Sequence, residues 1–132
     1  MTKKTIWITG GSTGIGKALA IRFASKGWNV AISARRVELL DDLSNSYDNI
    51  FGFPLDVTDK ERCKEVFNEI KNKFENVDIC FFSTGTWDPK KEKNIDVEQM
   101  ENVFKVNFFG TVNSIKAVEQ YFRDKKNGII TI

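Results

Sequence analysis

Histidine is absent from this chain of 132 residues. Its absence excludes Ser-His and Cys-His nucleophilic catalysis and His-ligated metal sites within these residues, and we predict no metal centre. Only two cysteines occur, Cys63 in a helix pattern and Cys80 in a strand pattern. They are predicted to be buried, reduced thiols, which favours a cytoplasmic location.

Long apolar runs and clusters of one charge are also missing. The apolar runs are only a few residues long, whereas a membrane-spanning helix needs about 20, and Met1–Lys4 leads into a strand pattern without a signal-peptide core. The 20 Lys and Arg residues and 18 Asp and Glu residues are dispersed and give a net charge of +2. We therefore predict one globular domain over residues 1–132 that binds neither nucleic acid nor a membrane surface.

Short apolar segments alternate with helical patterns along the chain. The predicted strands are Thr5–Thr9, Trp28–Ser33, Ile50–Leu55, Val77–Ser83 and Gly128–Ile132. The predicted helices are Ile15–Lys26, Val37–Tyr47, Asp59–Phe74 and a long segment, Val97–Arg123, bent near Asn107–Gly110 because glycine weakens a helix interior. This order predicts an α/β fold, a doubly wound parallel sheet with strand order 3-2-1-4-5, and the sequence ends within strand five.

The first predicted helix carries Ile15, Ala18, Leu19, Arg22 and Phe23 at helical spacing. Residues spaced in this way share one face of a helix. We expect this stripe to face the sheet.

The strongest functional signal is the glycine loop, residues 9–16, which reads Thr-Gly-Gly-Ser-Thr-Gly-Ile-Gly between a strand and a helix. Glycines let the backbone approach a phosphate, and the N–H groups and dipole of a helix N-terminus attract an anion. This arrangement suits the pyrophosphate of a dinucleotide. Gly11–Lys17 also matches most of a P-loop, but Ala18 stands where Ser or Thr would hold magnesium, which disfavours a nucleotide triphosphatase. A glycine turn without a ligand is the remaining alternative.

The end of the second strand indicates which dinucleotide would bind. In dinucleotide-binding folds, an acidic residue about 20 positions beyond the glycines binds the ribose 2′-hydroxyl of NAD. The segment Ile32–Arg36 has no acid and contains Arg35 and Arg36. A guanidinium suits a 2′-phosphate and can stack on adenine, which favours NADP over NAD. The alternative is a pair of solvated arginines at the start of a helix.

The end of the third strand carries a second polar group. In Leu55–Asp59, the carboxylate of Asp56 could accept a hydrogen bond from the adenine amino group. Alternatively, Asp56 or Asp59 caps the helix that follows.

Four motifs, in order along the chain, resemble the classical branch of the short-chain dehydrogenase/reductase family. They are Thr-Gly-x-x-x-Gly-Ile-Gly at 9–16, Ala-Arg-Arg at 34–36, Leu-Asp-Val-Thr-Asp at 55–59 and Val-Asn-Phe-Phe-Gly-Thr at 106–111. The resemblance implies an NAD(P)-binding Rossmann fold. It also implies a homo-oligomeric oxidoreductase that transfers hydride between NADP(H) and a small carbonyl or alcohol substrate.

The resemblance also assigns candidate site residues. It implies that the cofactor is bound by Gly10, Ser12, Thr13, Gly14, Ile15, Gly16, Arg35, Arg36, Asp56, Val57, Ser83, Thr84 and Gly85. Asn107 matches the active-site asparagine of the family, which helps to hold a water of the proton relay. The alternative for Asn107 is a residue at a helix kink.

The sequence departs from the family pattern in two places. The family has Asn-Asn-Ala-Gly after the fourth strand, and this chain has Phe82–Gly85, in which Ser83 cannot reproduce the paired donor and acceptor of an amide. Support for the centre of the sheet is therefore expected to be weaker. The family's catalytic serine and Tyr-x-x-x-Lys pair follow strand five, and we expect them to be missing from this chain, which leaves an inactive dinucleotide-binding module as the alternative function. Tyr121–Lys125 fits the spacing literally but precedes strand five, so we expect Tyr121 to pack and Lys125 to be solvated.

Overall fold

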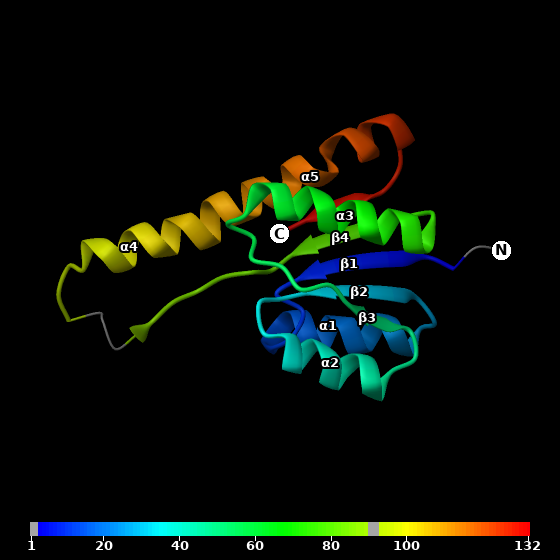
Figure 1. The fold of residues 1–132 in the computed structure, drawn as a ribbon, viewed down its shortest axis with the longest axis horizontal. Coiled ribbons are helices and arrows are strands. Elements are labelled where there is room, and N and C mark those ends of the chain that lie inside the picture. Colours follow the sequence, from blue (N-terminus) through cyan, green and yellow to red (C-terminus); the bar gives the residue numbers. More distant parts are fainter. Residues whose placement is uncertain (1–2, 90–92) are drawn as a thin grey trace.

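The computed structural model describes residues 3–89 and 93–132 and contains one parallel sheet with helices on both faces (Figure 1). The strands are β1 Thr5–Thr9, β2 Asn29–Ser33, β3 Ile50–Gly52, β4 Ile79–Phe82 and β5 Ile129–Thr131. The helices are α1 Gly14–Ser25, α2 Val37–Ser46, α3 Lys60–Phe74, α4 Val97–Val103 and α5 Gly110–Lys125, and a π-helix, η2 Phe104–Phe109, joins α4 to α5. The strand order is β3-β2-β1-β4-β5, which confirms the predicted topology.

Each face of the sheet has its own hydrophobic core. Ile6 and Ile8 of β1 pack with Ala20 of α1 and Leu40 of α2, and Trp7 between them points to the opposite face. Successive side chains of a strand alternate between the two faces. A strand covered on both sides therefore reads as an unbroken apolar run, as β1 does.

Trp7 forms the centre of the core beneath α3 and α5. Its side chain is 0% exposed, its ring stacks on Phe67 at a centroid distance of 5.7 Å, and it meets Phe82 edge-on at 5.5 Å. The indole Nε1–H donates to the Ser33 hydroxyl at 2.9 Å. The buried indole therefore has a polar partner, and this bond also joins β1 to β2.

The buried face of α1 differs from the predicted apolar stripe. Gly16, Ala20 and Ala24 face the sheet, whereas Ile15 is 76% exposed. The prediction for Ile15 was wrong because α1 lies so close to the sheet that only small residues fit between them. Spacing alone indicates an apolar face but does not reveal how near the helix lies.

The strands are shorter than predicted at several ends. β3 stops at Gly52, two residues before Pro54, which has no N–H to donate to a ladder. The chain still follows β2 beyond that point, because Phe53 N donates to Ile32 O at 2.8 Å and Leu55 N to Ala34 O at 3.0 Å. The extended course of residues 50–55 was thus predicted, but not where the regular pairing ends.

The long helical segment contains η2 at the place where a bend was predicted. Gly110 directly follows η2 and is buried. A Cβ at this position would lie 2.5 Å from Val57 Cγ2, so glycine is required by close packing against the β3–α3 connection. Asn113 Nδ2 supports the same contact by donating to Val57 O at 2.9 Å.

The end of α5 is fixed to the start of β4 by polar contacts. The hydroxyl of Tyr121 accepts from Val77 N at 2.9 Å, and its ring meets Phe67 at 5.3 Å. Lys125 Nζ donates to Val77 O at 2.8 Å and lies 3.7 Å from Asp78 Oδ1. The prediction that Tyr121 packs is confirmed, but the prediction that Lys125 is solvated was wrong, because this lysine caps a carbonyl beside the core.

Within residues 3–89 and 93–132, no helix has the length and apolarity that a membrane crossing requires.

The packing at Gly110 leads to a stability prediction. Gly110→Ala should lower the free energy of unfolding by about 1–3 kcal/mol, because the added methyl overlaps Val57. Alanine is the better helix former by about 1 kcal/mol, so the sign of the change distinguishes packing from helix propensity. Urea denaturation measures it, with Val112→Ala on the exposed side of α5 as a control that should change stability by less than about 0.5 kcal/mol. A Gly110→Ala protein as stable as the parent would contradict this packing argument.

The two cysteines are free and buried, as predicted. Burial raises the pKa of the Cys63 thiol to about 11 and raises that of Cys80 as well. At about pH 8 only about one Cys63 thiol in a thousand is therefore ionised. We expect neither thiol of the folded chain to react with a disulfide reagent at this pH, and both to react in denaturant. Rapid labelling of one thiol in the folded protein would show that the core opens locally.

Candidate functional site

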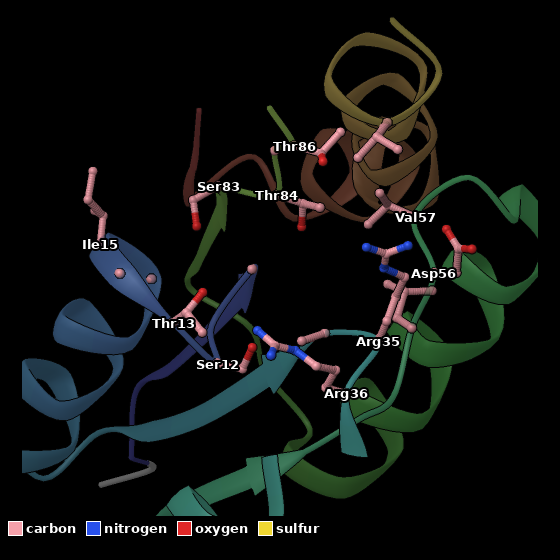
Figure 2. A pocket seen from close by; sticks show the side chains of 17 residues that line it. Ser12, Thr13, Ile15, Arg35, Arg36, Asp56, Val57, Ser83, Thr84 and Thr86 are labelled. Carbon is pink, nitrogen blue, oxygen red and sulfur yellow. The ribbon is translucent and has the colours of Figure 1, made fainter. Parts of the chain in front are cut away.

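A pocket of about 510 Å³ lies at the carboxyl ends of the strands (Figure 2). It is lined by the glycine loop after β1 and by residues that follow β2, β3 and β4, together with Val106 of η2. In a parallel sheet these strand ends meet at one edge, and β1 and β4 are the neighbours at which the strand order reverses. The structure brings all of the residues predicted to bind cofactor into this pocket: Gly10, Ser12, Thr13, Gly14, Ile15, Gly16, Arg35, Arg36, Asp56, Val57, Ser83, Thr84 and Gly85.

The glycine loop packs directly against the end of β4. A Cβ at Gly10 would lie 2.9 Å from Ser83 O, and one at Gly16 would overlap Gly10 O and lie 2.9 Å from Ser83 Oγ. Gly10 also has a φ of 67°, which L side chains rarely adopt. The chain at Gly10, Gly16 and Ser83 thus meets where no further side chain fits. This contact places the N-terminus of α1 at the floor of the pocket.

The N-terminus of α1 is open to an anion. Thr13 is its N-cap residue, but the Thr13 side chain makes no capping hydrogen bond, and the first turn carries no acidic residue. The first N–H groups of a helix have no partner within the helix, and the helix dipole places partial positive charge there. A negatively charged group in the pocket would satisfy both.

Ser83 links the two central strands at the floor of the pocket. Its hydroxyl donates to Thr9 O at 2.7 Å, and its backbone N–H donates to the same oxygen at 3.3 Å. Among the described residues, the hydroxyl of Thr9 is buried and has no hydrogen-bond partner. Ser83 thus joins β4 to the glycine loop through two donors, only one of which belongs to its side chain. The weaker support expected from serine in place of the family's asparagine stays a prediction.

Charged side chains form the wall at the ends of β2 and β3. In Figure 2, the guanidinium of Arg35 lies toward Asp56 and Val57, and that of Arg36 lies toward Ser12. Both arginines line the pocket. No acidic residue lies in the stretch Ile32–Arg36.

The carboxylate of Asp56 is the acidic group of this wall. Its partial burial raises its pKa, but hydrogen bonds from Thr58 N at 2.9 Å and Thr58 Oγ1 at 2.8 Å, and the positive charges of Arg35 and Lys105, bring the pKa below its usual value. Asp59, rather than Asp56, caps α3 by accepting from Arg62 N at 3.0 Å. Asp59 is therefore the cap of α3, and Asp56 lines the pocket.

Asn107 lies in η2 and holds the loop that follows β4. Its Oδ1 accepts from Thr86 N at 2.7 Å, and its Nδ2 donates to Thr86 O at 3.0 Å. This pair of bonds places Gly85 and Thr86 against the helix. π-Helical turns occur often at functional sites, because the extra residue changes which groups face outward. The catalytic role of Asn107 stays a prediction.

The pocket also contains residues that the sequence interpretation did not assign. These are Ala34, Leu55, Thr86 and Val106. Val106 belongs to a motif that was recognised, so its place beside Asn107 was a usable signal. Thr86 had no such signal, since its backbone is placed by a side chain 21 residues away.

Solved structures with this fold include nucleotide-bound proteins. The structure described as ElxO with NADP bound is 29% identical, has a TM-score of 0.88, and the alignment covers 98% of this chain and 55% of that one. A short-chain dehydrogenase from Streptomyces avermitilis is 28% identical with a TM-score of 0.89, over 99% of this chain and 49% of that one.

Proteins with similar sequences are also oxidoreductases. The NADPH-dependent 1-acyldihydroxyacetone phosphate reductase of Schizosaccharomyces pombe is 32% identical over 98% of this chain and 44% of its own length. An uncharacterized oxidoreductase of Listeria monocytogenes is 34% identical over 96% of this chain and 53% of its own length. The chain thus spans about half the length of these relatives. A sequence model of the short chain dehydrogenases matches residues 4–132, and the chain belongs to that family.

Proposed function

We propose that this chain binds NADP(H) in the pocket at the carboxyl edge of its sheet, as the cofactor-binding part of an oxidoreductase. The observation that carries the proposal is the meeting, in one pocket, of a glycine-rich loop, an uncapped helix N-terminus and two arginines. Each of these groups suits a different part of a phosphorylated dinucleotide.

The pyrophosphate is assigned to the glycine loop. Gly10 and Gly16 let the loop pack tightly against the end of β4, and Gly14 faces open space, because a Cβ there would meet nothing within 4 Å. The first turn of α1 offers N–H groups and a favourable dipole. The pocket volume of about 510 Å³ is within the ordinary range for small-molecule sites. The residues present therefore fit the group.

The adenosine 2′-phosphate is assigned to Arg35, with Arg36 beside it. Both side chains line the pocket, and a guanidinium makes strong, charge-assisted hydrogen bonds to phosphate oxygens. The NADP-bound structure and the NADPH-dependent reductase among the relatives support this assignment. Asp56 and Val57 are assigned to the adenine, and Ser83, Thr84 and Gly85 to the side nearer the nicotinamide.

The reaction we propose is hydride transfer with a small carbonyl or alcohol substrate. When bound, the cofactor would supply the redox chemistry at C4 of its nicotinamide ring: NADPH would give a hydride to a carbonyl carbon, and NADP+ would accept one from an alcohol carbon. Asn107 holds Thr86 and Gly85 in place and is assigned to the proton relay. Tyr121 and Lys125 are not assigned a proton-transfer role, because both are hydrogen-bonded to Val77 just before the start of β4, whereas the pocket lies at the other end of that strand.

The second candidate function is an inactive dinucleotide-binding module, which would use the same pocket. The hydrogen bonds of Tyr121 and Lys125 to Val77 support this candidate, because they leave neither side chain assigned to proton transfer. The two functions differ only in hydride transfer. Incubation with NADPH and a panel of aldehydes and ketones, followed by analysis for alcohol products, distinguishes them. Bound NADPH without any product would favour the module.

Arg35→Ala should weaken NADPH binding by about 10- to 100-fold, because a charge-assisted hydrogen bond contributes about 1.5–3 kcal/mol. NADH, which lacks the 2′-phosphate, should lose less than about threefold, since only stacking on adenine is affected. Titration calorimetry measures both affinities. Arg123→Ala, which removes the same charge from the exposed side of α5, is the control and should leave both affinities unchanged. Unchanged NADPH binding in Arg35→Ala would refute the role assigned to this arginine.

A further inference from the structure

The wall assigned to the adenosine contains an electrostatic conflict. Asp56 lines the same pocket as Arg35 and Arg36, and its low pKa keeps it negatively charged at neutral pH. A 2′-phosphate near this wall carries about two negative charges and would be repelled by the carboxylate. A site that selects the phosphorylated cofactor therefore needs positive charge beyond Arg35 to offset Asp56.

The π-helix brings a third cation to this wall. Lys105 immediately precedes Val106, which lines the pocket, and its side chain is exposed. Among the described residues, Lys105 forms no salt bridge. Its positive charge nevertheless acts on Asp56, together with that of Arg35. Asp56 thus has one cation from the end of β2 and another from η2.

Packing fixes the position of η2 relative to Asp56. Gly110, directly after η2, contacts Val57, which is the residue after Asp56. Asn113 Nδ2 donates to Val57 O at 2.9 Å. These contacts hold η2, and with it the backbone of Lys105, against the β3–α3 connection, so the position of this backbone does not depend on a flexible loop.

We propose that Lys105 is a cofactor-selectivity residue, whose ammonium group offsets the carboxylate of Asp56 and favours a ligand with a 2′-phosphate. This inference rests on the proposed NADP(H) site and adds a residue to it. Lys105 acts through the field at the mouth of the pocket, whereas Arg35 is assigned direct hydrogen bonds. Its contribution should therefore be smaller than that of Arg35, and salt should reduce it.

The test uses adenosine 2′,5′-bisphosphate and adenosine 5′-monophosphate as probes, because they differ only in the 2′-phosphate. Lys105→Gln should weaken binding of the bisphosphate by about three- to tenfold and that of the monophosphate by less than about twofold. Because Asp56 is also assigned to the adenine, which both probes contain, its variant is judged by the ratio of the two affinities. Asp56→Asn should shift that ratio toward the bisphosphate. In the double variant the ratio of the two affinities should return close to that of the parent chain, because the two charges act on the 2′-phosphate in opposite directions.

The controls separate this role from a structural one. Lys116→Gln removes the same charge from an exposed position further along the same helical run and should change neither affinity. Urea denaturation should show that Lys105→Gln is as stable as the parent chain. Raising the salt concentration should reduce the difference between Lys105→Gln and the parent.

Three outcomes would overturn one of the proposals. If the parent chain binds neither NADPH nor the bisphosphate, the proposed function fails. If the parent binds both and Arg35→Ala abolishes binding but Lys105→Gln matches the parent, only the role of Lys105 fails. Equal weakening of both probes by Lys105→Gln would also overturn selectivity, because the effect would then not depend on the 2′-phosphate.

Discussion

The close contact of Gly10 and Gly16 with the end of β4 is the constraint on which the rest of this structure depends. No Cβ fits at either glycine, because the backbones of the glycine loop and of residue 83 meet there. This contact decides which face of α1 packs on the sheet, since Gly16, Ala20 and Ala24 follow one another along that face. It also places the open N-terminus of α1 beside the strand ends. The absence of side chains at Gly10 and Gly16 therefore permits close packing, and that packing brings the loop and the helix N-terminus to the pocket that would hold a phosphate.

The opposite wall of the pocket depends on a second close contact, between Gly110 and Val57. This contact holds the π-helix against the connection that follows β3. The carboxamide of Asn107 then ties the loop after β4 to the same helix through Thr86. The positions of the loops after β1, β3 and β4 are thus fixed by contacts with helices that pack on the sheet. The pocket is consequently a property of the packed sheet and not of any single loop.

Charge is distributed unevenly around this pocket, although the chain as a whole has a net charge of only +2. Arg35 and Arg36 follow the end of β2 and line the pocket, and the positive charges of Arg35 and of Lys105 in η2 both act on Asp56. The uncapped N-terminus of α1 adds the partial charge of a helix dipole at the other end. A ligand with phosphates at two separate places would match both regions. Membership of the short-chain dehydrogenase family is consistent with this distribution.

The sequence by itself determined the order of strands and helices, the parallel sheet and the set of residues at the strand ends, because periodicity and glycine position are local signals. It also identified Asp59 as a cap candidate, since a cap acts on its own helix. Only the tertiary structure decided that Ile15 is exposed, that Lys125 binds the Val77 carbonyl and that the charge of Lys105 acts on Asp56. These facts depend on distances between elements far apart in the chain. Packing sets those distances, and residue spacing along one helix carries no information about them.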